Sequence, residues 1–402
     1  METDRKVAID RGEHTTQMEP LLLPTTSRYR SDLTELSFEL AARSAGFKRS
    51  LPAGILAALS DLVRSMNCYY SNLIEGHDTH PVDIERALKG DYSSNREQRN
   101  LQLEAQAHIV VQKWIDQGVL IGCATKMESI KEIHKRFCDH LPPELLVVED
   151  PETKGQFEVV PGELRTRDVK VGRHIPISPG AVERFMFRFE DAYVTLNRSE
   201  MILAAAAAHH RLAWIHPFID GNGRVARLMS HAMLLDALDT GGLWSVARGL
   251  ARNVEDYRRH LAACDQPRHG DLDGRGNLSE QSLAEFTRFF LEICLDQVAF
   301  MEALVRPDAL RRRIFAWTNN LIQEGSLPKN SGRILESILF RGELPRSEVQ
   351  ELIGASTRTA SRAVSALTGH GAVTTASSRA PLKIGFTVEL ASHWMPGLFP
   401  PN

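Results

Sequence analysis

The chain has 402 residues, of which 43% are hydrophobic and 25% are charged, and its net charge is -3. This length predicts two or three domains, each large enough for its own hydrophobic core. The composition is typical of a globular protein, and the near-neutral charge excludes a surface that is basic all over, although one segment can still be basic.

The cysteines and the apolar runs exclude several classes of protein. Five cysteines are scattered along the chain and none belongs to a CxxC pair, which argues against a disulfide framework or a zinc site. The N-terminal sequence METDRKVAIDRGEH lacks the apolar stretch of a signal peptide. The longest apolar run, at 201–208, is too short to cross a bilayer. We therefore expect a cytoplasmic protein with no membrane partner.

The first part of the chain is expected to be an irregular segment followed by helices. Residues 1–30 are polar and show no periodicity. Over 31–100, apolar residues such as Ile55 and Leu59 recur every three or four positions, which predicts an N-terminal helical region. The helix that contains them should end before Gly76, because glycine suits the left-handed conformation just after a helix.

The predicted core spans residues 101–300. Its helices are interrupted at 141–180 by prolines, glycines and short alternating runs, which predict a loop with a small hairpin around Asp168–Ile175. A helix at 198–214 should begin with a capping box that starts at Asn197, and its alanine run favours helix.

The character of the sequence changes after Gly325. We expect a linker helix at 301–325, then three short helices and a hairpin of two strands at 326–393, and a tail at 394–402. A tight GAS turn between the second and third of the three helices is typical of a winged helix-turn-helix. The predicted fold is therefore mainly α, with a C-terminal winged helix-turn-helix.

The stretch HPFIDGNGRVAR, which starts at His216, gathers many polar groups within twelve positions. The GNG turn at 221–223 precedes a predicted helix, so its backbone amides and the helix dipole favour an anion. Arg224 and Arg227 share one helix face and suit a polyphosphate. Asp220 suits a magnesium ion that bridges phosphate oxygens, and His216 suits removal of a proton from a hydroxyl.

Together these groups provide a base, a metal ligand and a phosphate cradle. Such a site suits transfer from a nucleotide by positioning and charge stabilisation. Each residue alone also has a structural interpretation, because glycine turns before helices are common and arginines on a helix are usually solvated. Pro217 and Phe218 are assigned to turn geometry and packing.

HPFIDGNGRVAR resembles the signature of Fic-domain proteins, HxFx(D/E)GNGRxxR, and agrees at each specified position. Upstream, AHHRLAWIHPF and PGELRTRDVKVG are also similar to family sequence, so the likeness extends over residues 100–300. The family moves AMP from ATP to a side-chain hydroxyl of a target protein and releases pyrophosphate. The resemblance implies a Fic-type helical core with a β-hairpin flap, protein adenylyltransferase activity, ATP as substrate, and Mg²⁺ or Mn²⁺ as cofactor.

The resemblance also implies a role for each residue of the site. His216 is the general base and Asp220 the metal ligand. The phosphates are bound by Gly221, Asn222, Gly223, Arg224 and Arg227. The flap holds the target backbone by strand addition through Val169, Lys170, Val171 and Gly172. Tyr257 lines the adenine side, although an aromatic residue at helical spacing also suits the core. The second half of the flap, RHIPISPG, departs from the proline-rich form of the family.

A second stretch, SNLIEG, fits the inhibitory motif of the same family, (S/T)xxxE(G/N), through Ser71, Glu75 and Gly76. A glutamate in the last turn of a helix faces the negative end of the dipole and gains from a cationic partner. The resemblance implies that Glu75 pairs with Arg227 in the space that the γ-phosphate of ATP needs, and that the inhibitory helix is N-terminal. In the reverse reaction, Glu75 would orient a water. The alternative is an exposed glutamate that simply ends a helix.

The C-terminal region has a modest positive balance. Residues 326–393 contain eight Lys or Arg and five Glu. The predicted recognition helix, STRTASRAVSALTGHG, places Arg358 and Arg362 four positions apart, which suits a phosphate backbone or a major groove. Docking of another protein is the alternative use of a winged helix.

The sequence therefore predicts an autoinhibited protein adenylyltransferase that modifies a Ser, Thr or Tyr hydroxyl of a target protein and of itself. A homodimer and DNA binding through the winged helix are further expectations. Three alternatives stay open: a de-AMPylase of the same fold, an ATP-sensing winged-helix transcriptional regulator, and a transferase of UMP or GMP.

Overall fold

The computed structural model describes residues 8–149, 154–238 and 240–400. Helices form most of the regular structure in these ranges, and the strands are limited to one two-stranded pair and one three-stranded sheet. Within the same ranges, no helix combines the length and the hydropathy that a bilayer crossing requires.

The helices of the main body follow one another along the chain. The N-terminal ones are α1 (Arg30–Arg49), α2 (Ala53–Ile74), α3 (Pro81–Leu88) and α4 (Arg96–Asp116). The core ones are α5 (Met127–Asp139), α6 (Val182–Tyr193), α7 (Arg198–Ile215), α8 (Asn222–Leu238), α9 (Val246–Arg252), α10 (Val254–Cys264) and α11 (Glu280–Val305). Short 3-10 turns lie at Thr15–Met18, Pro143–Leu145 and Pro179–Ala181.

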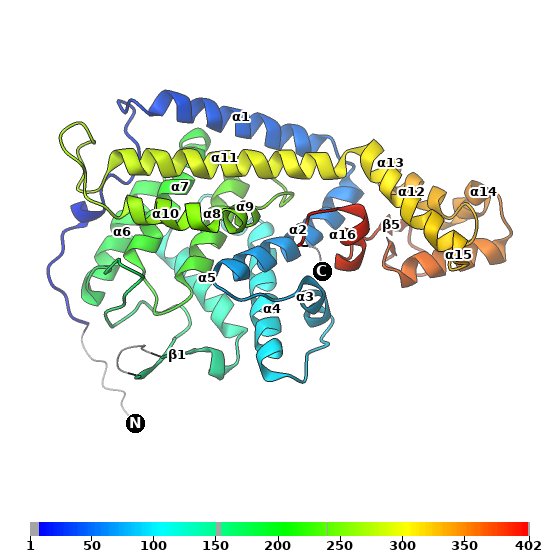
Figure 1. The fold of residues 1–402 in the computed structure, drawn as a ribbon, viewed down its shortest axis with the longest axis horizontal. Helices are drawn as coiled ribbons and strands as arrows, with labels where there is room; N and C mark the ends of the chain where they lie inside the picture. Colours follow the sequence, from blue (N-terminus) through cyan, green and yellow to red (C-terminus); the bar gives the residue numbers. More distant parts are fainter. Residues whose placement is uncertain (1–7, 150–153, 239, 401–402) are drawn as a thin grey trace.

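α7 and α8 lie at the centre of the main body (Figure 1). α7 begins at the predicted cap, where Oδ1 of Asn197 accepts the N–H of Glu200 at 3.0 Å. The alanines at 204–208 are buried, and their small side chains let α8 pack along α7. The loop at 216–221 joins these two helices, so the HPFIDGNGRVAR stretch lies inside the fold.

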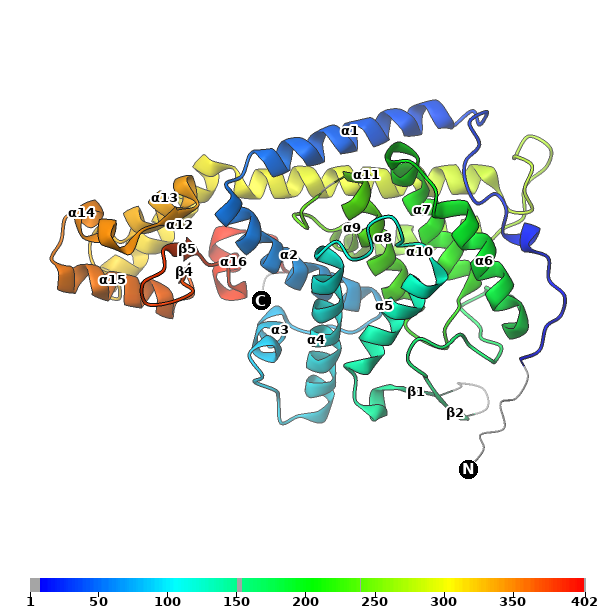
Figure 2. The same cartoon turned by 180° about the vertical axis from the view of Figure 1, so that it is seen from behind.

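α1 and α11 run side by side as two long helices along one edge of the molecule (Figures 1 and 2). α11 ends at Val305, and α12 (Pro307–Gln323) begins at once. Because Pro307 has no N–H to continue the preceding helix, the chain breaks there. The predicted linker helix at 301–325 is thus two segments, the end of α11 and α12.

From residue 8 to the start of α1 the chain is irregular apart from a 3-10 turn at Thr15–Met18. It is nevertheless part of the packed structure, since Met18 and Leu21 are buried. Arg11 and Asp10 bind Asp168 and Arg184 of the core, so this segment follows the surface of the main body closely.

In the 141–180 region, the predicted hairpin at 168–175 is shorter than expected, and a pair of strands forms earlier in the chain. β1 (Val147–Glu149) and β2 (Gln156–Glu158) pair antiparallel, with Val148 opposite Phe157, which the sequence analysis did not foresee. The hairpin predicted at 168–175 is a single antiparallel bridge between Val171 and His174.

The C-terminal group extends from one end of the main body (Figures 1 and 2). In chain order it consists of α13 (Gly332–Arg341), β3 (Glu343–Leu344), a 3-10 turn (Arg346–Glu348), α14 (Val349–Ile353), α15 (Thr357–Gly369), β4 (Val373–Thr374) and β5 (Leu382–Ile384). The strands pair antiparallel in the order β3-β5-β4. The GAS turn lies between α14 and α15, with Gly354 at φ 62° and Ser356 capping α15. Three helices and a hairpin are present; the identification as a winged helix-turn-helix stays a prediction.

The segment predicted as a tail is packed. α16 (Val388–Trp394) is followed by residues whose side chains enter the core, and both Trp394 and Leu398 are fully buried. The Tyr70 hydroxyl donates to the carbonyl of Leu398 at 3.2 Å, and the ring of Phe399 meets Tyr69 edge-on. Residues 394–400 are therefore attached to α2 and are not a free tail.

α2 connects the main body to the C-terminal group. It packs against α4, α8 and α9 on one side and contacts β5 on the other. Near its start, Gly54 lies so close to the backbone of Gly342 that a Cβ at Gly54 would clash. The helix that ends at the SNLIEG stretch thus contacts both parts of the molecule.

Candidate active site

The loop between α7 and α8 is closed by its own side chains. His216 has a left-handed backbone with φ 52°, and Gly221 follows with φ 81° before α8 begins. The Asn222 side chain bonds both backbone groups of Phe218, accepting from N–H and donating to the carbonyl, each at 2.9 Å. Its side-chain amide is therefore engaged in shaping the loop, and the phosphate contact expected of Asn222 stays a prediction.

A buried histidine that the sequence analysis missed supports this loop. The rings of His134 and Phe218 stack at 3.9 Å with an angle of 2° between their planes. Nδ1 of His134 accepts the N–H of Gly162 at 2.9 Å. Burial lowers the pKa of His134 to about 4, so the ring is neutral and packs as an aromatic surface at neutral pH. Because His134 lies on α5, far from the loop in sequence, no local pattern indicated it.

His216 is oriented and uncharged. Its Nδ1 lies 3.3 Å from the carbonyl of Ala213, an acceptor, so Nδ1 carries the proton and Nε2 carries the free lone pair. Burial, and then the nearby Arg165, lower the pKa of His216 to about 4. The imidazole is therefore neutral at neutral pH with a free lone pair on Nε2, which is the form that a general base requires, while the lowered pKa makes it a weaker base than an ordinary histidine.

The structure places Arg227 against the SNLIEG stretch. Arg227 is buried, and its Nε donates to the Ser71 hydroxyl at 2.9 Å while its Nη2 donates to the Ser71 carbonyl at 3.1 Å. The same Nη2 lies 2.5 Å from Oε1 of Glu75. Three contacts therefore join α8 to the last turn of α2.

The Glu75 carboxylate lies over the first turn of α8. A Cβ on Gly223 would lie too close to Oε1 of Glu75 in its present position, so the carboxylate would have to shift. Gly76, at φ 88°, has the left-handed conformation predicted just after α2. Burial opposes ionisation of Glu75, but Arg227, with smaller help from Arg224 and His77, outweighs it and lowers the pKa of the carboxyl. A charged carboxylate thus occupies an anion position at a helix N-terminus.

Arg224 has donors left over. It is buried, lies over the ring of Phe137 at 4.7 Å, and its Nη2 donates to Asp220 at 3.2 Å. Its Nη1 lies 3.6 Å from Glu104, beyond hydrogen-bond geometry. Within the described parts of the chain, Nε and Nη1 of Arg224 have no hydrogen-bond partner. Two buried, charged donors without acceptors suit the oxygens of a phosphate.

Glu104 and His77 form a second acidic contact beside the cradle, and sequence reasoning missed both. Glu104 is buried on α4 and bonds Nδ1 of His77 at 2.5 Å. This hydrogen bond raises the pKa of His77 above its ordinary value although burial opposes the charge. His77 comes two residues after Glu75, so the pair also holds the chain just after the SNLIEG helix.

Asp220 is the candidate metal ligand. Its side chain is 52% exposed at the mouth of the loop. Among the residues that the structure describes, no three or more His, Cys, Asp or Glu side chains gather to form a metal site. A single accessible carboxylate fits Mg²⁺ in a nucleotide site, because that ion is usually held by one or two carboxylates, phosphate oxygens and waters.

Tyr257, expected on the adenine side, is part of the core. Its ring is buried in α10, and its hydroxyl bonds Nε2 of His209 at 2.6 Å. Burial raises the pKa of Tyr257 to about 12, with Arg227 nearby acting in the opposite direction. The residue lies behind the arginine, and a contact with adenine stays a prediction.

The predicted flap residues Val169, Lys170, Val171 and Gly172 run along the edge of the site. Val171 and His174 exchange two backbone hydrogen bonds of 3.0 Å across the Gly172 turn. Val171 and Ile175 expose 40% and 72% of their side chains, so apolar groups face outward there. Nε2 of His174 donates to the carbonyl of Trp214 at 2.8 Å, which anchors the turn to the end of α7.

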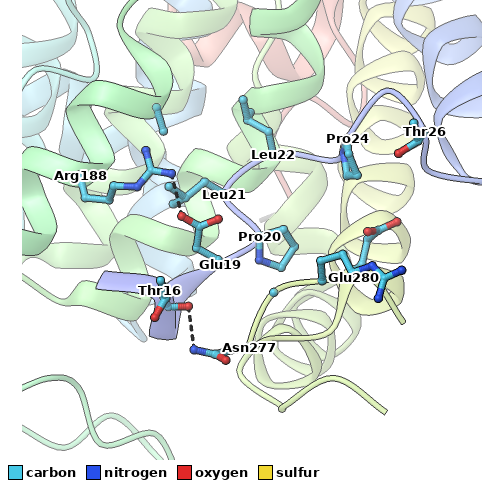
Figure 3. Close-up of a pocket in the computed structure, with 13 residues that line it drawn as sticks. Thr16, Glu19, Pro20, Leu21, Leu22, Pro24, Thr26, Arg188, Asn277 and Glu280 are labelled. Atoms are coloured by element: carbon cyan, nitrogen blue, oxygen red, sulfur yellow. Dashed lines mark hydrogen bonds and ion pairs between the residues drawn. The ribbon is translucent and has the colours of Figure 1, made fainter. Parts of the chain in front are cut away.

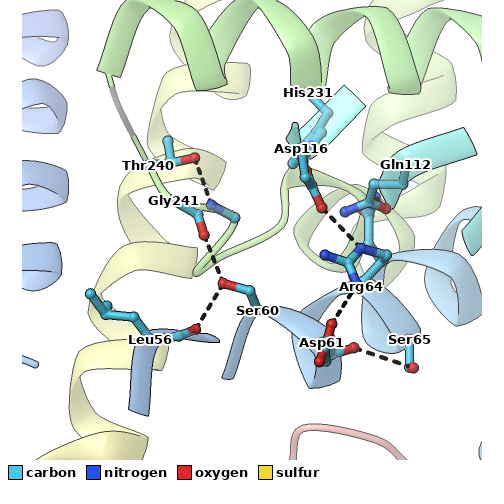
Figure 4. A network of polar contacts seen from close by, with 12 residues as sticks. Leu56, Ser60, Asp61, Arg64, Ser65, Gln112, Asp116, His231, Thr240 and Gly241 are labelled. Atoms are coloured by element: carbon cyan, nitrogen blue, oxygen red, sulfur yellow. Dashed lines mark hydrogen bonds and ion pairs between the residues drawn. The ribbon is translucent and has the colours of Figure 1, made fainter. Parts of the chain in front are cut away.

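A polar network joins α2, α4 and α8 (Figure 4). Nε of Arg64 donates to Asp116 at 2.9 Å, and Nε2 of His231 lies 2.6 Å from the other oxygen of the same carboxylate. Burial opposes ionisation of Asp116, but His231 and Arg64 outweigh it and lower its pKa. α2 and α8 are thus joined by ion pairs at two levels, this network and the Glu75–Arg227 contact.

A separate hollow of about 570 Å³ lies away from the loop (Figure 3). It is formed by the N-terminal segment, α6 and the chain that leads into α11. Arg188 pairs with Glu19 at 2.7 Å, and Asn277 donates to the carbonyl of Thr16 at 2.9 Å across it. None of the residues that line it belongs to the 216–227 stretch, so the signature residues are not part of this hollow.

Comparisons with known proteins agree with the geometry. Residues 124–234 match the family model described as Fic/DOC family. The protein adenylyltransferase Fic of Drosophila willistoni is 28% identical over 215 residues, which are 52% of this chain and 40% of the relative. The protein of the same description from Drosophila ananassae is 34% identical over 127 residues, or 31% and 22% of the two chains. The chain thus matches less than half the length of these curated relatives.

A solved structure supports the fold. A Fic family protein from Desulfovibrio desulfuricans G20 superposes with a TM-score of 0.53 over 90% of this chain and 98% of its own, at 16% identity. This likeness confirms the predicted mainly helical, Fic-type fold. Residues 124–234, which contain the loop and its flanking helices, thus match the Fic/DOC family model, and the chain shares the fold of a Fic family protein.

Proposed function

We propose that the chain is a protein adenylyltransferase that transfers AMP from ATP to a hydroxyl of a target protein and is restrained by its own Glu75. The observation that carries the proposal is the pairing of a neutral, oriented His216 with a cradle in which Arg224 has buried donors without acceptors. The names of the curated relatives point to the same chemistry.

In the proposed reaction, Nε2 of His216 takes the proton of the target hydroxyl. The hydroxyl oxygen forms a bond to the α-phosphorus of ATP, and the bond from that phosphorus to the pyrophosphate oxygen breaks. Arg224, Arg227 and the amides at the start of α8 stabilise the charge of the departing pyrophosphate. A Mg²⁺ or Mn²⁺ at Asp220 would neutralise phosphate charge.

Glu75 supports the proposed restraint by its position. Its carboxylate lies where the amides of α8 and Arg227 would otherwise meet the distal phosphates. An ATP molecule that entered the site would have to displace this ion pair or bind in a shifted pose. We therefore propose that the wild-type chain transfers AMP slowly, and that loss of the Glu75 carboxylate increases the rate of transfer.

The test uses intact mass after incubation with ATP and Mg²⁺. We compare the wild-type chain, Glu75→Gly, and Glu75→Gly/His216→Ala, and expect only Glu75→Gly to gain whole AMP units. Each variant is also titrated with ATP by calorimetry, so that loss of binding is distinguished from loss of chemistry. If ATP binds to every variant and none gains mass, self-transfer is contradicted, and release of AMP from a modified protein becomes the function to test.

A second candidate function, nucleic-acid binding, is favoured by the charges of the C-terminal group. No Asp or Glu occurs in the sequence over 352–388, which contains α15 and the β4–β5 hairpin. Arg358, Arg362 and Arg379 are exposed there, with no carboxylate in ion-pair contact among the described residues. The acidic Glu348, by contrast, is paired with Arg341. This stretch of the chain is thus basic and rich in Ser and Thr hydroxyls, which suits a phosphate backbone.

This candidate is tested with the full chain and a labelled duplex DNA by fluorescence anisotropy at several salt concentrations. Arg358→Ala/Arg362→Ala should weaken binding and reduce the slope of log K against log salt by about 2, since each phosphate contact adds roughly 0.9. Arg341→Ala, on the paired side, is the matched control. Equal affinity for all three proteins would contradict a DNA surface on α15 and favour protein docking.

A further inference from the structure

Arg165 lies in the segment that leads into the flap, and within the described ranges its guanidinium donates hydrogen bonds to backbone carbonyls alone. The residue is 2% exposed. Nε donates to the His216 carbonyl at 2.8 Å, Nη1 to Arg167 at 2.8 Å and Nη2 to Ile177 at 2.5 Å. Arg167 and Ile177 stand at the two ends of the flap, so one side chain joins both ends to the residue proposed as the base.

Four consecutive carbonyls at the end of α7 are bound by this segment. His174 binds that of Trp214, and Nη2 of Arg165 also approaches that of Ile215 at 3.4 Å. The carbonyl of His216 accepts from Nε, and that of Pro217 accepts the backbone N–H of Arg165 at 2.8 Å. The last carbonyls of a helix lack partners within the helix, and a cation is favoured beside them. Arg165 and His174 fill that role here.

His216 needs such support because its backbone is left-handed at φ 52°, a conformation that non-glycine residues adopt at a cost. The nearest acidic residue on the flap, Asp168, is bound in bidentate fashion by Arg11 of the N-terminal segment. Because Arg11 binds Asp168, the Arg165 guanidinium can donate to the backbone carbonyls of the loop. Burial lowers the pKa of Arg165 to about 10, which still leaves it charged at neutral pH.

We infer that Arg165 is a positioning residue that fixes Nε2 of His216 relative to a target backbone bound on the flap. The inference rests on the proposed adenylyl transfer and goes beyond it, because it assigns a role to a side chain whose hydrogen bonds go to the backbone of the loop and of the flap. The phosphate cradle is built on α8 and makes no contact with the Arg165 guanidinium among the described residues. Loss of the guanidinium should therefore slow transfer while leaving nucleotide affinity unchanged.

The test compares Arg165→Gln, Arg165→Lys and Arg165→Ala in the Glu75→Gly background, with Arg167→Gln as the matched control on the same segment. We expect Arg165→Gln to lower kcat for self-transfer about 10- to 100-fold at unchanged Kd for ATP, since a misplacement of about 1 Å costs that much. Guanidinium ion added to Arg165→Ala should restore part of the rate. Arg167→Gln should keep the parent rate, because its exposed side chain does not bind the loop.

A second readout needs no activity. Trypsin cleaves after Lys170 and Arg173 within the flap, and mass spectrometry of the fragments gives the rate at each site. We expect about tenfold faster cleavage in Arg165→Gln than in Arg167→Gln, because the flap ends are released. Unchanged cleavage and unchanged kcat would overturn the inference, as would a fall in kcat accompanied by an equal loss of ATP affinity without guanidinium rescue. A parent Glu75→Gly that transfers no AMP to itself contradicts self-transfer, and cleavage alone then decides whether Arg165 holds the flap.

Discussion

On the cradle side of the site, the buried Arg224 and Arg227 face carboxylates, whereas on the flap side the buried Arg165 faces only carbonyls. A carboxylate on a side chain is an anion that a phosphate can replace. A carbonyl belongs to the backbone and moves only when the loop itself moves. The difference teaches that the cradle is built for exchange of anions, while the flap side is built to hold one geometry.

The largest expected effect comes from the residue where the two sides meet. In the Glu75→Gly background, His216→Ala should lower the rate of AMP transfer by about 10²–10⁴-fold, the usual contribution of a general base. The measurement is intact mass against time at saturating ATP. Unchanged ATP affinity would show that the cradle does not need the imidazole, while a rate equal to that of the parent would remove His216 from the chemistry.

The pH dependence separates an ordinary histidine from this one. Because burial lowers the pKa of His216 to about 4, Glu75→Gly should keep most of its transfer rate at pH 5, where a base with pKa 6.5 would retain only about 3% of its neutral form. The folded pKa lies below the unfolded one, so this residue's contribution to stability falls as pH drops from 6.5 toward 4. A profile of kcat/KM from pH 4.5 to 8 checks the first point; an acid limb near 6.5 would contradict it.

Removing the Glu75–Arg227 ion pair should lower the free energy of unfolding. Arg227→Met leaves Ser71 and Glu75 without their donor and should lower the free energy of unfolding by about 1–3 kcal/mol, toward the lower end because Glu75 is 33% exposed. Urea unfolding provides the measurement. Glu75→Gln/Arg227→Met should lose less than the two single variants summed, and strict additivity would mean that the pair does not interact.

The smallest expected effect concerns Glu104, the second acidic group near the cradle. Glu104→Gln keeps the side-chain shape and removes the charge that lies 3.6 Å from Arg224. In Glu75→Gly/His216→Ala, which binds ATP without turnover, Kd should fall about two- to tenfold, as expected for a modest charged contact. Calorimetry gives the value, with Glu128→Gln on the exposed face of α5 as the control. Weaker binding would show that Glu104 supports the arginine and does not compete for it.

Local patterns were sufficient for the loop and for the end of α2. The helix after the loop, the cap at Asn197 and the left-handed Gly76 depend on residues that are neighbours in sequence, and the structure has each of them. The predicted GNG turn is shorter than expected, because Asn222 and Gly223 already belong to α8. The Glu75–Arg227 contact was expected because the SNLIEG and HPFIDGNGRVAR stretches both resemble motifs of one family.

The supports of the site were not predictable in the same way. His134, Glu104 and Arg165 act through contacts made by packing of separate elements, and a lone buried His, Glu or Arg has no periodicity to announce it. The alternating residues near 168–175 suggested a longer hairpin. In the structure, the His174 side chain bonds the end of α7, and the strand pairing is limited to one bridge. The tail was misjudged because its apolar residues, such as Trp394 and Leu398, were too few to form a pattern.

The attachment of residues 397–399 to α2 sets how close a distant part of the chain is to the active site. Tyr70, whose hydroxyl binds the Leu398 carbonyl, comes five residues before Glu75, which is about 7.5 Å along the helix axis. Arg248 of α9 holds the neighbouring Gly397 carbonyl at 2.9 Å, so this short segment is gripped from two helices. A change that separates residues 397–399 from α2 would therefore act within one and a half helical turns of Glu75. In distance, residues 397–399 are therefore close neighbours of Glu75, the residue that we propose restrains the transfer.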